Sequence, residues 1–289
     1  MPALRTALIR ILPVLAAVAC LSPPARAATR SDIEGRVLRL LEDSRARGAV
    51  VVLDVRTGEA VASVGSGRDV SAPVLPLSLV KLYAAALWWD HGMGDGAFAQ
   101  SGAGRVTVHE LLVHGWDRPG AEMAIEIRRR MGARSALAEL RRLRLGAPPG
   151  SLTLEGVDDA VWGEALSVGE RCVRVTLPEV SRFLRAIGLG GGGLLKAETA
   201  DRLQRAMRDA VSRGSARGAD ASLAGTRWQL GGKTGTGPAE AAPNFDGCFA
   251  GLLFDGSRPR YTVAVYIDGR GRGGGVAASV AASLTAILP

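Results

Sequence analysis

Lysine is scarce in this sequence of 289 residues. Among its 36 basic side chains only Lys81, Lys196 and Lys233 are lysines, and all the others are arginines. An arginine guanidinium keeps its proton in a protein, whereas a buried lysine amine can lose it. The few lysines therefore indicate positions where a guanidinium would not serve.

Cysteine is also rare, which limits metal and disulfide chemistry. Only Cys20, Cys172 and Cys248 are present. Cys172 and Cys248 are too far apart in sequence for a common zinc motif, so no metal site and no other cofactor is predicted. A disulfide between them would need Cα atoms within about 7 Å, which the sequence does not establish. Buried free thiols are the preferred interpretation.

Long apolar runs are missing, and the one near the start is short. Ile11 to Leu21 falls below the about 20 residues that cross a bilayer. Arg5 and Arg10 accompany it, and Ala25-Arg26-Ala27 offers the small residues that signal peptidase reads. We expect residues 1–27 to be a signal peptide and 28–289 to be one exported, periplasmic domain. A retained anchor and lipidation at Cys20 are the alternatives.

Aromatic residues make up only 4% of the chain, which argues against nucleic-acid binding despite the formal charge of +8. Loss of the three arginines of the predicted signal lowers that charge to +5. Single-stranded nucleic acid is usually bound by a basic patch with stacking rings, and the arginines here stand on amphipathic segments without interleaved aromatics. Solvated helix faces explain them better.

Hydrophobic patterning predicts strands at both ends of the chain and helices between them. β-branched runs at 49–55 and 60–64 flank a glycine turn, and alternating residues at 249–254 and 261–267 indicate two more strands. Helical spacing covers 31–47, 75–87, 107–113, 121–131, 135–143, 177–187, 198–211 and 276–288, and loops are expected at 92–104 and from 148 to 170. The pattern favours an α/β sandwich with an inserted helical lobe.

Ser78 and Lys81 are the central pair of the sequence. Leu75 to Leu87 has helical spacing, so residues three apart share a face and the lysine amine can approach the serine hydroxyl. An uncharged amine in hydrogen-bond reach activates a serine nucleophile. By itself the pair is more often a helix cap beside a solvent-directed lysine. Lys233, which opens Lys233-Thr234-Gly235-Thr236, changes that balance.

Ser-x-x-Lys followed far downstream by Lys-Thr-Gly is typical of serine acyl transferases. The chain resembles the transpeptidase domain of penicillin-binding proteins, within the serine β-lactamase and D,D-peptidase superfamily. The resemblance implies an antiparallel sheet flanked by helices with an inserted helical lobe, an α+β arrangement. Similar stretches occur in the family's order at 49–54, 57–58, 76–81, 165–169, 175–180, 233–236 and 249–252.

The resemblance also implies roles for individual residues. Ser78 would be the nucleophile, with Lys81 as its base, and Lys233 and Thr234 would bind a terminal carboxylate. The backbone N–H groups of Ser78 and Thr236 would form an oxyanion hole, and Gly235 would leave room for substrate. The implied substrate is the D-alanyl-D-alanine stem peptide of peptidoglycan, with β-lactam antibiotics as inhibitors.

One element of the family pattern is missing. Its Ser-x-Asn motif cannot occur between the other motifs, because the only asparagine is Asn244. His114-Gly115-Trp116-Asp117 stands in its place, and either His114 or Asp117 is chemically able to carry a proton. Simple loss of the element is the alternative.

Three functions follow from these observations. The preferred one is a D,D-transpeptidase or carboxypeptidase of the cell wall, expected to be a monomer with other cell-wall synthesis proteins as partners. A serine β-lactamase would need a deacylating base, and Glu155, Glu164 and Glu170 lack the glutamate-x-x-asparagine setting of the common enzymes. A non-catalytic domain that binds cell-wall peptide or β-lactam is the third.

Overall fold

The computed structural model of the protein describes residues 28–146, 148, 150–239, 244–269 and 273–289. Within them, five strands form one antiparallel sheet in the order β2-β1-β7-β6-β5. The strands are β1 (Gly48–Asp54), β2 (Ala60–Ser66), β5 (Trp228–Pro238), β6 (Phe245–Asp255) and β7 (Arg258–Ile267). Strands from both ends of the chain therefore meet in one sheet, which confirms the predicted fold class.

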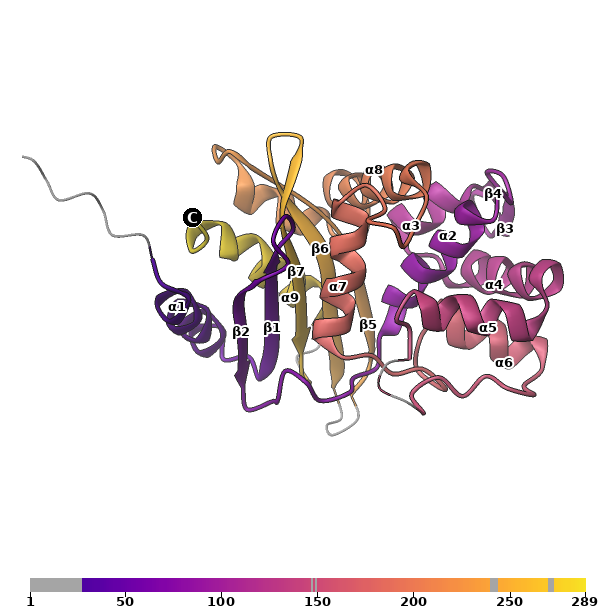
Figure 1. Ribbon diagram of the computed structural model, residues 1–289, viewed down its shortest axis with the longest axis horizontal. Helices are drawn as coiled ribbons and strands as arrows, with labels where there is room; N and C mark the ends of the chain where they lie inside the picture. The colour runs from indigo at the N-terminus through magenta and orange to yellow at the C-terminus, as the bar shows by residue number, and fades with distance from the viewer. Residues whose placement is uncertain (1–27, 147, 149, 240–243, 270–272) are drawn as a thin grey trace, which may run out of the picture.

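The sheet is buried on both faces, and its side chains alternate between two hydrophobic clusters. Val50 and Val52 pack with α1 (Arg30–Asp43) and α9 (Gly273–Ser283) on one face. Val51 and Leu53 pack on the other face, toward α7 (Leu177–Gly188). Successive residues of a strand point to opposite faces, so continuous β-branched runs fit a sheet covered on both sides. Figure 1 shows α7 in front of the sheet and running along its strands, with a helical lobe beyond β5.

The helical lobe surrounds α2 (Val80–Asp90), which is buried along nearly its whole length. The other elements of the lobe are α3 (Val108–His114), α4 (Asp117–Met131), α5 (Ala133–Arg142) and α6 (Asp159–Ser167), with a hairpin of β3 (Phe98–Gln100) and β4 (Gly104–Val106). The helix α8 (Ala197–Ser212) packs against both α3 and β5. It therefore joins the lobe to the edge of the sheet.

Three predictions of local structure were wrong. The stretch from 148 to 170 contains α6, whose start is capped by the Asp158 side chain accepting from Val161 N, and whose Trp162 is fully buried. The predicted loop at 92–104 contains the hairpin β3–β4. The first helix ends at Asp43, and Gly48 opens the first strand instead of ending the helix.

The two cysteines of the described part are both free thiols, as preferred from the sequence. Cys248 is fully buried, whereas Cys172 is only half-buried. No group of three or more potential metal ligands is found among the described residues. Within those residues, too, no helix combines the length and apolar character needed to cross a bilayer. The predicted signal peptide, with Cys20, lies outside them.

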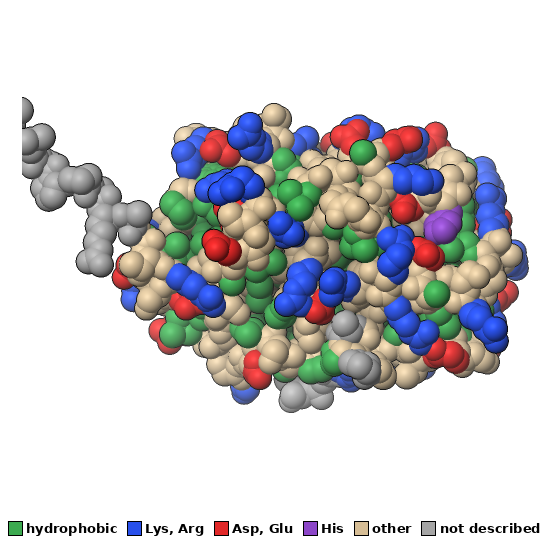
Figure 2. All heavy atoms as spheres, viewed as in Figure 1, with side chains coloured by type: hydrophobic (Ala, Val, Ile, Leu, Met, Phe, Trp, Pro, Cys, Tyr) green, Lys and Arg blue, Asp and Glu red, His purple; other side chains and the backbone are tan. Residues whose placement is uncertain are grey.

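On the face shown in Figure 2, basic and acidic groups are interspersed. Many arginines pair with a carboxylate one helical turn away, as Arg130 does with Glu126 and Arg202 with Glu198. This arrangement agrees with solvated helix faces.

Candidate active site

Ser78 lies in a short 3-10 turn, Leu77–Leu79, that leads directly into α2. It is the one residue between Val74 and Trp89 that is not buried. The preceding Leu77 has a φ of +52° and is fully buried, and its N–H donates to the Gly169 carbonyl at 3.3 Å. A leucine in the left-handed region is strained, and such strain persists only where surrounding contacts impose it. The fold therefore holds the Ser78 hydroxyl at the surface of an otherwise buried segment.

The Lys81 amine is fully buried and has three polar neighbours. Its Nζ lies 3.0 Å from Ser78 Oγ, 2.7 Å from Asp117 Oδ1 and 2.6 Å from the Ser167 carbonyl oxygen. Burial lowers the pKa of Lys81, and the Asp117 carboxylate acts in the opposite direction. The structure thus joins the two residues of the Ser-x-x-Lys pair and adds an acidic partner.

The three neighbouring oxygens can form hydrogen bonds with the Lys81 amine in either of its protonation states. An ammonium donates three hydrogens, one to each oxygen. A neutral amine donates two and keeps one lone pair, so it can donate to Asp117 and Ser167 while accepting from the Ser78 hydroxyl. Proton transfer from Ser78 to Lys81 therefore needs no rearrangement of these groups.

Lys233 is the second buried amine and stands on β5. Its Nζ donates to the Thr234 carbonyl at 2.8 Å, and no salt bridge to it is found within the described part of the chain. Burial, followed by the positive charge of Lys81, lowers the pKa of Lys233 to about 7. An amine of this kind has capacity for an incoming anion.

β5 is pressed against the turn that carries Ser78. A Cβ added to Gly235 would lie 3.1 Å from Ser78 N, 2.9 Å from Leu77 Cβ and 2.6 Å from Cys248 Sγ. Gly235 was expected to leave room for substrate, and the groups that approach it in the structure are the turn that carries Ser78 and Cys248. Thr236, next along β5, is exposed, and its Oγ1 accepts from Gly274 N at 3.1 Å.

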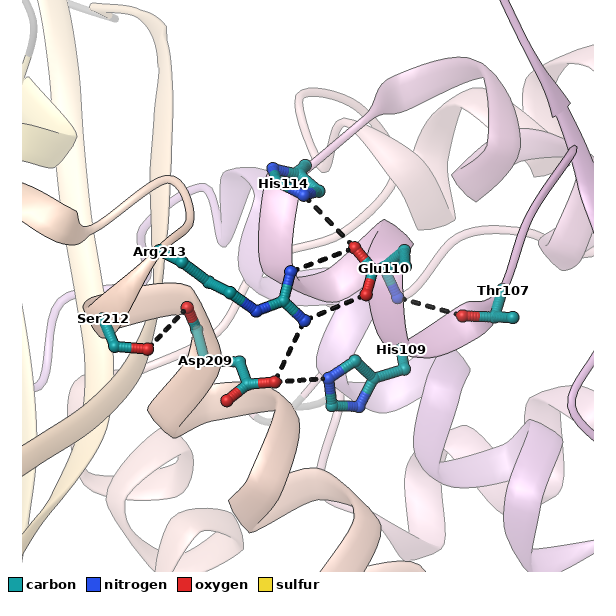
Figure 3. Close-up of polar contacts among 7 residues, drawn as sticks. All are labelled: Thr107, His109, Glu110, His114, Asp209, Ser212 and Arg213. Atoms are coloured by element: carbon teal, nitrogen blue, oxygen red, sulfur yellow. Dashed lines mark hydrogen bonds and ion pairs between the residues drawn. The ribbon is translucent and has the colours of Figure 1, made fainter. Parts of the chain in front are cut away.

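The two candidates for the missing Ser-x-Asn element have different surroundings. Asp117 begins α4 and meets Lys81, as described above. His114 ends α3, where its Nε2 lies 3.2 Å from Glu110 Oε2 and its ring stacks on Trp116 with centroids 4.7 Å apart. Figure 3 shows the His114 side chain directed toward Glu110. Of the two, only Asp117 contacts the Ser78–Lys81 pair through a hydrogen bond or ion pair found in the described chain.

Several groups at the site were not anticipated from the sequence. The Ser167 carbonyl accepts from Lys81, and the Thr234 hydroxyl donates to Ser215 Oγ at 3.2 Å. Gly115 caps α3 with a φ of +76°, and a Cβ there would lie 3.0 Å from Lys233 Nζ. A glycine directly after an apolar helical pattern is a recognisable cap signal, but the sequence gives no sign of which buried group it faces.

Comparison with protein families gives one match that spans more than half of the chain. The model described as penicillin binding protein transpeptidase domain matches residues 122–286. That segment contains Lys233 to Gly235 and begins after Ser78, Lys81 and Asp117. A search of curated proteins finds no match.

Solved structures with the same fold include several transpeptidase domains. The transpeptidase domain of FtsI4 D,D-transpeptidase from Legionella pneumophila aligns with a TM-score of 0.68 at 17% identity, covering 88% of this chain and 94% of its own. That of Burkholderia pseudomallei penicillin-binding protein 3 gives 0.68 at 21% identity, with 89% and 92% covered. Penicillin-binding protein A from M. tuberculosis, solved as an imipenem acyl-enzyme complex, gives 0.71 at 18% identity, with 90% and 78% covered.

Proposed function

Because the chain belongs to the penicillin-binding protein transpeptidase domain family, we propose that it is a D,D-transpeptidase or carboxypeptidase that works through an acyl-enzyme on Ser78. The observation that carries the proposal is the 3.0 Å contact between Ser78 Oγ and the buried amine of Lys81. Its substrate would be the D-alanyl-D-alanine end of a peptidoglycan stem peptide. Penicillin-binding protein A, with the same fold, has been solved as an acyl-enzyme with a β-lactam, imipenem.

In the first step Ser78 Oγ attacks the carbonyl carbon of the penultimate D-alanine. A C–O bond forms as the Ser78 proton passes to Lys81 Nζ in its neutral form, which the lowered pKa of this amine favours. The negative charge that develops on the carbonyl oxygen would be stabilised by the backbone N–H groups of Ser78 and Thr236. Close contact between β5 and the Ser78 turn at Gly235 supports this pairing of N–H groups.

Collapse of the tetrahedral intermediate breaks the C–N bond, and the leaving nitrogen of the terminal D-alanine takes up a proton. Asp117 is the group we propose to carry it from Lys81, because its carboxylate contacts Lys81 Nζ while its side chain remains 65% exposed. The position of His114 against Glu110 supports a structural role for that residue instead. An amine of a second stem peptide, or water, then attacks the ester carbon and gives a proton to Lys81; the C–O bond to Ser78 breaks, and Ser78 Oγ takes up that proton.

Lys233 and Thr234 would bind the terminal carboxylate of the acyl donor. The amine of Lys233 is buried without a carboxylate partner in the described chain, and the Thr234 side chain is only slightly exposed beside it. A buried ammonium without a partner of opposite charge is unfavourable, so an anion bound beside Lys233 stabilises the charged form of this amine. Recognition of a free carboxylate agrees with a stem peptide as substrate.

The placement of the domain in the cell is part of the same proposal. We propose that residues 1–27 are a signal peptide, with lipidation of Cys20 or a retained anchor as alternatives, and that 28–289 act outside the cytoplasm as a monomer. Peptidoglycan stem peptides are found there, and other cell-wall synthesis proteins would be its partners. Detection of a mature N-terminus near Ala28 by mass spectrometry of the secreted protein would test cleavage.

A β-lactamase is the second candidate function. Of the glutamates considered as its deacylating base, Glu170 has the most suitable position. Glu170 follows the Gly169 that contacts the Ser78 turn, and a Cβ on Gly237 would lie 3.2 Å from Glu170 Oε1. Burial raises the pKa of Glu170. By contrast, Glu155 pairs with Arg141 on the surface. If the protein hydrolyses penicillin, Glu170→Gln should slow that turnover.

A fluorescent penicillin separates the candidates. We expect stable labelling that is lost in Ser78→Ala and kept in Ser71→Ala, a matched change at an exposed serine. Rapid loss of label from the parent protein would indicate a β-lactamase, and no label would indicate a binding domain without catalysis. Labelling of Ser78→Ala at the parent level would refute Ser78 as the nucleophile.

A further inference from the structure

A second hydroxyl stands beside the predicted carboxylate-binding residues. Ser215 Oγ accepts a hydrogen bond from Thr234 Oγ1 at 3.2 Å. Ser215 follows α8, whereas Thr234 lies on β5. Thr234 is largely buried, with 8% of its surface exposed, whereas Ser215 is exposed. A ligand can therefore reach the Ser215 hydroxyl from solvent, while that of Thr234 lies behind it.

The turn that carries Ser215 is fixed against the end of α3. Ser215 N donates to the Val113 carbonyl at 3.0 Å, and a Cβ on Gly214 would lie 2.2 Å from the same oxygen. Arg213 bridges the two helices, because its Nη2 lies 2.9 Å from Glu110 Oε1 on α3 and 3.0 Å from Asp209 Oδ2 on α8 (Figure 3). The hydroxyl is thus held in place before any ligand arrives.

Lys233 and Ser215 both lie close to Gly115. The point where Gly115 would carry a Cβ is 3.0 Å from Lys233 Nζ and 3.9 Å from Ser215 Oγ. The amine and the hydroxyl therefore both face Gly115, and no Gly115 side chain lies between them. A hydroxyl is both donor and acceptor, so Ser215 can accept from Thr234 and still donate to an anion.

We propose that Ser215 is a specificity-determining residue: its hydroxyl accepts from Thr234 and donates a hydrogen bond to the terminal carboxylate of the acyl donor, beside the amine of Lys233. The inference rests on the proposed function for its substrate class, and it concerns recognition of the carboxylate rather than the acyl-transfer step. A hydrogen bond to a charged group is stronger than one to a neutral group. The Ser215 hydroxyl therefore discriminates between a free carboxylate and its neutral amide.

The test measures binding without chemistry. In a Ser78→Ala background, isothermal titration calorimetry compares a stem pentapeptide ending in D-alanyl-D-alanine with the same peptide amidated at its C-terminus. We expect the added Ser215→Ala to weaken binding of the free acid about tenfold, as for loss of one hydrogen bond to a charge, and to leave the amide unchanged. Ser215→Thr should restore the preference because it keeps the hydroxyl.

Ser212→Ala is the matched control, since this exposed serine ends α8, three positions before Ser215, and has its hydroxyl directed to the Asp209 carbonyl (Figure 3). It should leave both affinities unchanged. Equal weakening of acid and amide in Ser215→Ala, no weakening of either, or no binding of the acid would each overturn the inference. Penicillin labelling of the protein with Ser78 intact tests the proposed function separately. The calorimetry on Ser78→Ala measures binding alone and does not depend on that labelling.

Discussion

Replacement of Asp117 by asparagine tests how the base of the site is controlled. The change keeps an oxygen acceptor 2.7 Å from Lys81 Nζ and removes the negative charge. Two unit charges about 4 Å apart attract by ~1 kcal/mol in water and by ~4 kcal/mol near a protein surface. Because Lys81 is fully buried while the Asp117 side chain is 65% exposed, solvent screens much of this attraction.

We therefore take the attraction between Lys81 and Asp117 as about 1.4 kcal/mol, close to its value in water. Loss of this attraction corresponds to a change of about one pH unit in the pKa of Lys81. The sign follows from the pair: the carboxylate favours the ammonium, so its removal lowers that pKa further. The fraction of neutral amine at a given pH then rises. We expect the rising limb of the pH profile for acylation of Ser78 to move to lower pH by about one unit in Asp117→Asn.

The rate at the plateau carries the second half of the prediction. An amide cannot take up and release a proton as a carboxylate does, so loss of the proposed relay should lower the plateau about a hundredfold. The assay is the second-order rate of labelling by a fluorescent penicillin between pH 5 and 9, with Asp201→Asn, an exposed aspartate paired with Arg205, as control. An unmoved limb would refute control of Lys81 by Asp117, and an unchanged plateau would refute the relay.

Three further changes probe other parts of the site. Gly235→Ala places a Cβ 2.6 Å from Cys248 Sγ and 2.9 Å from Leu77 Cβ, so it should lower the melting temperature by several degrees and abolish labelling. Binding of the free-acid stem peptide to Ser78→Ala should weaken as the pH rises through about 7, because Lys233 loses its charge there, whereas binding of the amide should not. His114→Ala should change the labelling rate less than threefold, since this ring packs on Trp116 and meets Glu110.

The sheet and the Ser78–Lys81 contact follow from local signals. β-branched runs define β1 and β7 because their side chains have to fill both faces of the sheet. The spacing of Ser78 and Lys81 within one helical turn brings their side chains together whatever the rest of the chain does. Such contacts are set by the chain's own periodicity.

Local sequence signals could not decide between His114 and Asp117. Gly115 ends α3 in a left-handed conformation, and the chain then reverses so that Asp117 opens α4 against Lys81. Only two residues lie between the two candidates, and the direction of that reversal depends on how α3 and α4 pack. The Ser215–Thr234 contact is likewise fixed by packing of α8 between α3 and β5, for which no local pattern exists.

The site holds two buried amines and one carboxylate, so the charges of its lysines depend on one another. The positive charge of Lys81 lowers the pKa of Lys233, so the two amines disfavour being charged together. Burial disfavours the charge on Lys81, and Asp117 favours it. A carboxylate bound at Lys233 would favour the charge there, and its own negative charge would offset the repulsion that this adds at Lys81. Under the proposed function, binding of the acyl donor at Lys233 and control of the Ser78 base by Asp117 would therefore be largely independent.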